Sequence, residues 1–389
     1  MPTPQQLGLI KIVRSALTGQ AEVLPDGFDF ARCFDTIRRH RIFSMAYTGA
    51  VTCGIDEALP EMQKLFGKTC LEVARSEQQV WETGRLYDAF TKEKIDFLPV
   101  KGLAIKALYP QPDMRYMSDA DVLIRENQRE KIEKILGELG YEKYAESLCE
   151  IIYNSAGLHL ELHKHLIPPD IKDYFSYFGD SFKKAEKIDG TSHYRLSDDD
   201  HFIYIFTHFA RHYRGGGIGI KHMTDLWVCK TGLNLNEEYI KTELEKLKLY
   251  DFYVNIYKTL DCWFCDGETT EITDHITETV FASGAYGTAT AARLSDAARR
   301  SKNGNISSAK TSRTMWMLFL PYGIMCIKYP ILKKLPFLLP VFWVVRGLNS
   351  LVFRRNKTLS NLKEIGGLSA DEVKRFSDSL HLVGLEFDF

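Results

Sequence analysis

Apolar residues recur at spacings of three and four along most of the first 94 residues. Residues 28–51 follow this pattern, and residues 65–90 continue it. The period is typical of amphipathic helices. Neither stretch holds the run of about 20 apolar residues that a membrane-spanning helix requires. We therefore predict a helical region over residues 1–94.

Short strands and helices alternate after residue 94. Residues 95–102 and 118–124 have the composition of strands, and a helix should follow each of them, at 103–110 and at 127–140. Three further strands are predicted at 141–146, 150–155 and 158–166, the first two as a pair and the last with strict alternation. These segments predict a compact α/β unit over residues 95–190.

The pattern becomes helical again after Pro168 and Pro169. Aspartates cap a predicted helix at 198–213, another helix follows at 220–230, and residues 236–285 supply more. The small, polar segment 295–313 predicts a mobile loop. Four regions result, with boundaries at 1–94, 95–190, 191–296 and 297–389.

Two aspartates interrupt the apolar strand at 118–124. Asp119 and Asp121 are two positions apart, so their side chains point to the same face of the strand, while Ala120 and Val122 face the core. Two carboxylates this close repel each other unless a cation lies between them. The pattern therefore predicts a metal site.

A third acid, Glu161, belongs to the strictly alternating strand. Leu160 and Leu162 should face the core, which puts Glu161 on the open face. If this strand lies beside the one that carries Asp119 and Asp121, three carboxylates converge. Oxygen ligands of this kind suit Mg²⁺, with Mn²⁺ as the alternative.

Candidate phosphate-binding residues lie on either side of the predicted helix at 103–110. Lys101 and Gly102 end the first strand, and a glycine there lets phosphate oxygens approach the backbone. Arg115 lies in the loop that enters the strand with the aspartates, where it could neutralise phosphate charge. We predict a combined phosphate and metal site.

The order of these motifs resembles the nucleotidyltransferase (polymerase-beta-like) fold. The stretch from Leu98 to Ile124, with its Lys-Gly, arginine and Asp-x-Asp, is more specifically similar to the uncharacterised bacterial nucleotidyltransferases. The resemblance implies an α+β fold: a small mixed-sheet core flanked by N-terminal and C-terminal helical regions. The chain departs from the wider superfamily in one position, because Leu103 follows the glycine where serine is usual.

The resemblance also implies an activity, namely Mg²⁺-dependent transfer of a nucleoside monophosphate from an NTP such as ATP to an acceptor hydroxyl, with release of pyrophosphate. By it, Asp119, Asp121 and Glu161 are metal ligands and catalytic residues. Relatives often hold the triphosphate with a basic residue before an Asp-Leu pair, which here corresponds to Lys221 and Asp225. The alternative for these two residues is an ordinary ion pair within a helix.

Histidines accompany the carboxylates. His159, His163 and His165 share the face of Glu161. They could donate hydrogen bonds to the carboxylates, or bind zinc or manganese in a metal-dependent hydrolase. His208 and His212 are four apart on one helix face, and we expect a packing or phosphate-facing role for them. A further alternative for the whole chain is a nucleotide-sensing protein without turnover.

Charge is balanced overall but not along the chain. The net charge of −1 gives no reason to expect a specific nucleic-acid partner. The eight scattered cysteines suit reduced thiols in the cytoplasm, and the N-terminus lacks the pattern of a signal peptide. Between residues 297 and 363, however, there are thirteen Lys or Arg and no acid.

This basic region contains an apolar segment, 314–355. Its two uncharged runs are too short to cross a bilayer. It therefore predicts either a buried helical pair or peripheral contact with the inner membrane surface. The acceptor could accordingly be a small molecule, a sugar or lipid-linked group, or a protein, and the sequence does not choose among them.

Overall fold

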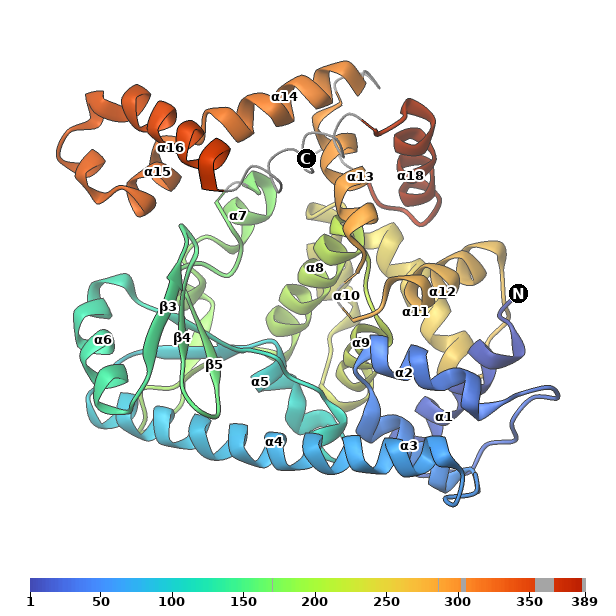
Figure 1. Ribbon diagram of the computed structural model, residues 1–389. Coiled ribbons are helices and arrows are strands. Elements are labelled where there is room, and N and C mark those ends of the chain that lie inside the picture. Colours follow the sequence, from blue (N-terminus) through green and yellow to red (C-terminus); the bar gives the residue numbers. More distant parts are fainter. Residues whose placement is uncertain (170, 286, 302–305, 354–366, 387–389) are drawn as a thin grey trace.

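The predicted strands form one mixed sheet with the order β1–β2–β5–β4–β3 (Figure 1). β1 (Phe97–Val100) pairs antiparallel with β2 (Ala120–Ile124), and β2 pairs parallel with β5 (His159–His163). β4 (Glu150–Asn154) and β3 (Glu142–Glu146) extend the sheet as antiparallel neighbours. The predicted adjacency of β2 and β5 is therefore confirmed.

This computed structural model describes residues 1–169, 171–285, 287–301, 306–353 and 367–386. The predicted basic residues at 302 and at 354–363 lie outside these ranges. The helix predicted at 103–110 is shorter in the structure. α5 (Gly102–Ile105) is only one turn long, and a 3₁₀ turn continues it to Leu108.

Alternation along the central strands gives the sheet two different faces. Ala120, Val122 and Leu160 are fully buried in a cluster that also contains side chains of α4 (Pro60–Lys92) and α6 (Arg129–Glu138). Figure 1 shows α4 passing beneath the sheet, with α6 at the β3 side. The acidic positions of β2 and β5 consequently lie on the opposite face, toward the helices of the second half of the chain.

The helix α4 is the longest element and reaches beyond the sheet. Leu86 and Phe90, near its C-terminal end, pack in the cluster under the sheet, whereas Met62 and Leu65 pack with the N-terminal helices. At about 1.5 Å per residue, its 33 residues span roughly 50 Å. One helix thus contributes to both hydrophobic clusters.

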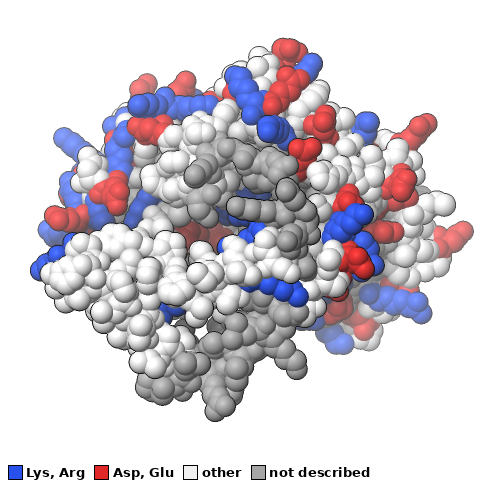
Figure 2. Space-filling view, turned by 90° about the horizontal axis from the view of Figure 1, so that it is seen from above, with Lys and Arg blue, Asp and Glu red and all other residues white. Residues whose placement is uncertain are grey.

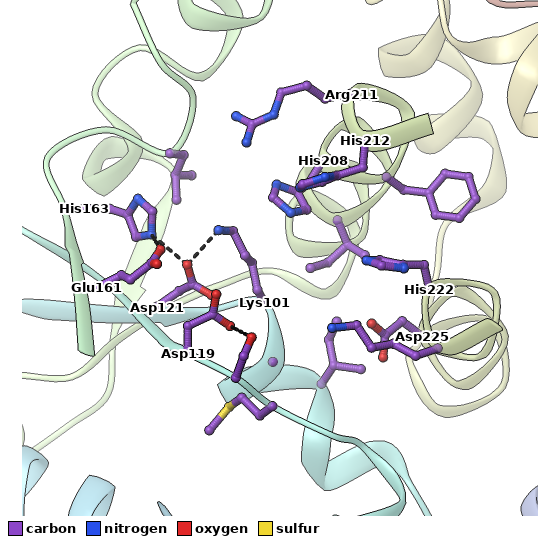
Figure 3. A pocket seen from close by; sticks show the side chains of 18 of the residues that line it. Lys101, Asp119, Asp121, Glu161, His163, His208, Arg211, His212, His222 and Asp225 are labelled. Atoms are coloured by element: carbon purple, nitrogen blue, oxygen red, sulfur yellow. Dashed lines mark hydrogen bonds and ion pairs between the residues drawn. The ribbon is translucent and has the colours of Figure 1, made fainter. Parts of the chain in front are cut away.

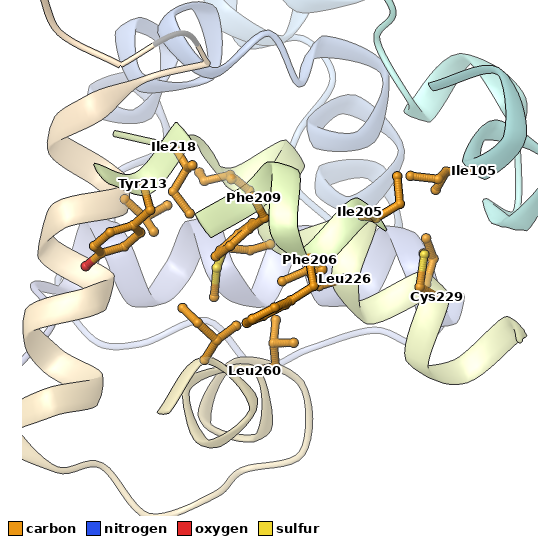
Figure 4. Packing of buried hydrophobic residues seen from close by; sticks show 14 of the residues in the cluster. Ile105, Ile205, Phe206, Phe209, Tyr213, Ile218, Leu226, Cys229 and Leu260 are labelled. Carbon is orange, nitrogen blue, oxygen red and sulfur yellow. The ribbon is translucent and has the colours of Figure 1, made fainter. Parts of the chain in front are cut away.

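The N-terminal helices and those after residue 197 share one hydrophobic cluster. In Figure 4, Phe206 and Phe209 of α8 pack near Leu226 of α9 and Leu260 of α11. The helices that contribute are α1 (Pro4–Thr18), α2 (Phe34–His40), α3 (Phe43–Thr52), α8 (Asp198–Gly215), α9 (Ile220–Gly232), α10 (Glu237–Lys246), α11 (Tyr250–Phe264) and α12 (Glu271–Ser283). α7 (Lys172–Phe178) and the hairpin β6 (Ala185–Lys187)–β7 (Tyr194–Leu196) connect this part to the sheet.

The prediction of a loop at 295–313 was wrong for most of its length. α13 (Ala289–Arg300) and α14 (Ile306–Leu318) cover the described residues of this segment. α13 buries Ser295 and Ala297 against neighbours that include α8 and α18 (Ala370–Leu382). Its small side chains allow this close packing, which the polar composition concealed.

The apolar segment after α14 is not the buried helical pair that was one of the two predictions. α15 (Tyr322–Lys328) and α16 (Leu339–Phe353) fold over a small cluster whose buried members are Met325, Cys326 and Leu332. Most of the remaining apolar side chains of the segment are wholly or partly exposed. Among the described residues, no helix is both long and apolar enough to cross a membrane.

Candidate functional site

A cavity of about 270 Å³ lies between the acidic face of the sheet and the helices α8 and α9 (Figure 3). Its sheet side carries carboxylates, and its helical side carries imidazole and basic groups. The polar residues that line it are Lys101, Arg115, Ser118, Asp119, Asp121, Cys149, Glu150, Glu161, His163, His165, His208, Arg211, His212, Lys221, His222 and Asp225. Gly102 also lines the cavity. All predicted site residues except His159 therefore lie in its wall.

The three predicted carboxylates lie close together in this cavity. Asp121 and Glu161 are direct partners in the parallel register of β2 and β5. Asp119 immediately precedes β2 and accepts a hydrogen bond of 2.9 Å from the Ser118 hydroxyl. Asp121 is only 3% exposed. The period of two along the strands thus concentrates negative charge in one small volume.

Asp121 forms two close contacts. Its Oδ1 lies 2.6 Å from Nζ of Lys101 and 2.7 Å from Nε2 of His163. Burial favours the neutral acid, but Lys101 and His163 outweigh it and hold the pKa of Asp121 well below its usual range. Asp121 is therefore an anion at every physiological pH.

The backbone of Lys101 adopts an uncommon conformation. Its φ is 52° and its ψ −123°, at the point where β1 ends. A side chain at positive φ costs on the order of 1–3 kcal/mol, which the surrounding structure must offset, and such residues concentrate at functional sites. The turn directs the ammonium group to Asp121, and despite burial this carboxylate raises the pKa of Lys101.

Space is tight on the other side of this turn. A Cβ at Gly102 would lie 3.1 Å from Sδ of Met117. The glycine thus allows the chain to pass close to the loop that leads into β2. The helix that follows has only four residues, so the N-terminal dipole expected for phosphate binding is small. Phosphate binding by Gly102 stays a prediction.

Glu161 has the opposite titration behaviour to Asp121. Burial, followed by the charges of Asp121 and Asp119, raises the pKa of Glu161 to about 7. His163 Nε2 lies 3.6 Å from one carboxylate oxygen and His159 Nε2 lies 3.7 Å from the other. Both predicted histidine neighbours are therefore beside this acid.

The donor atoms suit a divalent cation. One ligand atom each from Asp121, Glu161 and His163 lie within 4.8 Å of one another. The buried carboxylate of Asp121, the half-buried carboxylate of Glu161 and the imidazole of His163 could hold Mg²⁺ or Mn²⁺, with the imidazole favouring Mn²⁺. Asp119 is not part of this close set, although its carboxylate faces the same cavity.

Arg115 is held by a buried ion pair. Its Nε lies 2.6 Å from Oδ1 of Asp225, and the Tyr109 hydroxyl donates to the same oxygen over 2.7 Å. This pair joins the loop before β2 to α9. The sequence predicted phosphate binding for Arg115, and the structure adds a second role in fixing α9 against the sheet side of the cavity.

The helical wall carries three histidines and two bases. The rings of His208 and His212 have centroids 4.3 Å apart, and His222 of α9 lies 6.1 Å from His212. Burial lowers the pKa of His212 to about 3 and keeps the other two well below their usual value. These imidazoles are therefore neutral hydrogen-bonding groups.

Lys221 faces the cavity from the first turn of α9. Burial and the charge of Arg115 lower its pKa to about 8, so its ammonium form predominates at pH 7. Sequence reasoning missed Arg211 and His222 as cavity residues. A signal was present, because Arg211 lies three residues after His208 on the same helix and His222 adjoins Lys221.

The family of the chain is shown by a comparison with known protein families. Residues 26–265 match the model of a family described as "Uncharacterised nucleotidyltransferase". No curated protein matches. Among solved structures, the antibiotic-resistance factor ANT(2'')-Ia is similar, with 15% sequence identity and a TM-score of 0.34, over 47% of this chain and 96% of that chain.

Proposed function

Because the chain belongs to the uncharacterised nucleotidyltransferase family, we propose that it transfers a nucleoside monophosphate from an NTP to an acceptor hydroxyl and releases pyrophosphate. The observation that carries this proposal is the pairing of Asp121 with Glu161 across β2 and β5, with Asp119 in the same cavity. Acids that converge in one cavity could hold the metal ions that stabilise the attacking and leaving oxygens in phosphoryl transfer.

We assign the metal ligands to Asp119, Asp121 and Glu161, with His163 as an additional donor. Bound Mg²⁺ or Mn²⁺ would neutralise phosphate charge and stabilise the attacking and leaving oxygens. The low pKa of Asp121 keeps it ready to bind a cation without first losing a proton. On NTP binding, Lys101 exchanges part of its contact with Asp121 for a phosphate oxygen.

The other cavity residues would divide between phosphate and acceptor. Arg211 projects from α8 opposite the carboxylates (Figure 3), and Lys221 of α9 lines the same cavity, so a triphosphate would lie between the two walls. Glu161 would bind the catalytic metal and help to take the proton of the acceptor hydroxyl. Arg115 would hold phosphate while Asp225 keeps it oriented.

The cysteines bear on the cellular location of the protein. The eight cysteines form no disulfide, which agrees with a reducing compartment, and we propose that the enzyme acts in the cytoplasm. The acceptor is a hydroxyl compound whose class the cavity does not define.

The test is pyrophosphate release from each NTP with Mg²⁺ or Mn²⁺, with cell extract as the source of acceptor. Asp119→Asn and Asp121→Asn should each lower the rate by roughly a thousandfold, because metal ions supply several kcal/mol of transition-state stabilisation. Glu142→Gln is the matched control, since Glu142 is an exposed acid on β3 of the same sheet. Thermal unfolding of each variant verifies that the fold is intact.

Two other outcomes would replace the proposal. NTP binding by wild type without any pyrophosphate would favour the nucleotide-sensing alternative. Retention of zinc or manganese through dialysis, with hydrolysis but no labelled transfer product, would favour the hydrolase alternative, for which the Asp121–Glu161–His163 set is the supporting observation.

A further inference from the structure

The segment from α14 to α16 exposes an unusual amount of apolar surface. Of the 26 large apolar side chains that are exposed in the described chain, twelve lie between Met315 and Leu348. The most exposed are Phe337 at 72% and Val344 at 63%. Isolated exposed apolar residues are ordinary, but a concentration of this kind marks an interaction surface.

This segment is nevertheless folded. Trp343 Nε1 donates to the carbonyl oxygen of Leu320 over 2.9 Å, and the Tyr322 hydroxyl donates to that of Leu332 over 2.9 Å. Arg346 donates to the carbonyl oxygen of Met317. These bonds join α14, α15 and α16 into one unit, so the apolar side chains are displayed on a defined surface. We call it the α14–α16 surface.

The charged side chains that belong to this surface are all basic. Lys328, Lys333 and Lys334 are exposed beside the apolar side chains, and within the described residues they form no ion pair. Residues 297–363 contain no acid. Figure 2 views the molecule from above, and its lower left part is a broad uncharged area on which basic groups occur singly. Such a surface complements an anionic one.

We propose that the α14–α16 surface binds the interface of an anionic lipid bilayer. Apolar and aromatic side chains would enter the boundary between headgroups and acyl chains, and the lysines would contact lipid phosphates. α16 has 15 residues and is about 22 Å long, too short to cross a hydrocarbon core of about 30 Å. The binding is therefore peripheral.

This surface adjoins the rim of the cavity. A Cβ at Gly323 of α15 would lie 3.2 Å from Cδ2 of Leu148, which is itself exposed in the turn between β3 and β4. Cys149 and Glu150, the next two residues, line the cavity. Docking through α14–α16 therefore brings the carboxylate site near the bilayer surface.

The experiment is sedimentation of the full-length protein with vesicles of phosphatidylcholine alone or mixed with phosphatidylglycerol. It needs no nucleotide, so its result does not depend on the proposed activity. Wild type should sediment with the anionic vesicles only. Lys333→Gln/Lys334→Gln should weaken this binding by roughly thirtyfold, because each lysine near an anionic surface contributes roughly fivefold in affinity.

Lys68→Gln/Lys92→Gln is the matched control, since both lysines are exposed on α4 and the change in net charge is the same. It should bind vesicles as wild type does. Phe337→Ser/Val344→Ser should abolish binding while the net charge stays constant. An equal loss of vesicle binding in both lysine variants would overturn the proposal. So would a wild-type protein that does not bind the anionic vesicles. The surface would instead be assigned to a second copy of the chain by two results together. Wild type would sediment as a dimer that Val344→Ser converts to a monomer, and it would not bind vesicles.

Discussion

Glu72 of α4 is a half-buried acid outside the cavity. Its Oε2 accepts the backbone N–H of Ser44 over 3.2 Å, and its Oε1 is buried without a hydrogen-bond partner. Burial raises the pKa of Glu72 to about 7, Asp113 adds to this effect, and Arg41 and Arg75 oppose it. The folded protein thus holds this proton more tightly than the unfolded chain does.

We expect this proton to make stability depend on pH. Between about pH 4.5 and pH 7 the folded state binds more protons at Glu72 than the unfolded state, so the free energy of unfolding falls as pH rises. Glu72→Gln should remove about 2 kcal/mol of that decrease, which the thermal midpoint at pH 5, 6, 7 and 8 will measure.

The control for this prediction is Glu77→Gln on the exposed face of the same helix. Its midpoint should follow that of wild type at every pH. If the Glu72→Gln profile also runs parallel to wild type, Glu72 is ionised in the folded protein and the burial argument fails.

The residues of the candidate site differ in how far the sequence could predict them. Asp119, Asp121 and Glu161 follow from the period of two along strands, because the apolar neighbours fix which face is buried. The contact of His163 with Asp121 depends on side-chain direction within the sheet. Arg211 belongs to a helix whose position against the sheet is decided by tertiary packing, and no local pattern contains that information.

Among the elements, α1 and α3 cross at a glycine. A Cβ at Gly49 would lie 1.9 Å from the carbonyl oxygen of Ile12, a backbone atom that cannot move aside alone. Gly49→Ala should therefore lower stability by about 1–3 kcal/mol or more, read from denaturant unfolding.

Gly67 on α4 provides the opposite case. It lies within the helix, and a Cβ there would have no neighbour within 4 Å. Gly67→Ala should raise stability by about 0.5–1 kcal/mol through helix propensity alone. Equal effects of the two substitutions would show that the α1–α3 crossing tolerates a side chain.

Elements with a strong apolar pattern were predicted well. Elements whose composition is equally typical of loops were predicted poorly. The strand at 159–163 carries clear apolar alternation, and the strands at 97–100 and 120–124 are short runs of buried, mostly apolar residues. The helices α13 and α14 contain many small and polar residues, such as Ala, Ser and Thr, that also suit a loop, so the contacts of α13 with α14, α8 and α18 decide their structure. The helix predicted at 103–110 was longer than α5, because the 3₁₀ turn after α5 has a similar apolar pattern.

At the scale of the whole molecule, the Arg115–Asp225 pair connects the sheet side of the cavity to the helical side. Both side chains are buried. Asp225→Ala would leave a buried guanidinium without its carboxylate, and we expect a loss of about 3–5 kcal/mol in the free energy of unfolding. Equilibrium denaturation measures it.

The double variant Arg115→Met/Asp225→Leu tests the cause. It removes both charges and replaces them with apolar groups of similar size, so it should be more stable than Asp225→Ala. A double variant that is less stable than either single variant would mean that the ion pair itself, rather than the orphaned charge, supplies the stability.

The division into four regions at 1–94, 95–190, 191–296 and 297–389 stays a proposal. The helix α4 limits how independently such regions can fold. α4 contributes Met62 to one hydrophobic cluster and Phe90 to the other. A helix propagates cooperatively, so melting either end exposes apolar surface in its own cluster and weakens the helix that serves the other. The two cores should therefore unfold in a single transition, and a protease cut within α4 should release neither as a stable fragment.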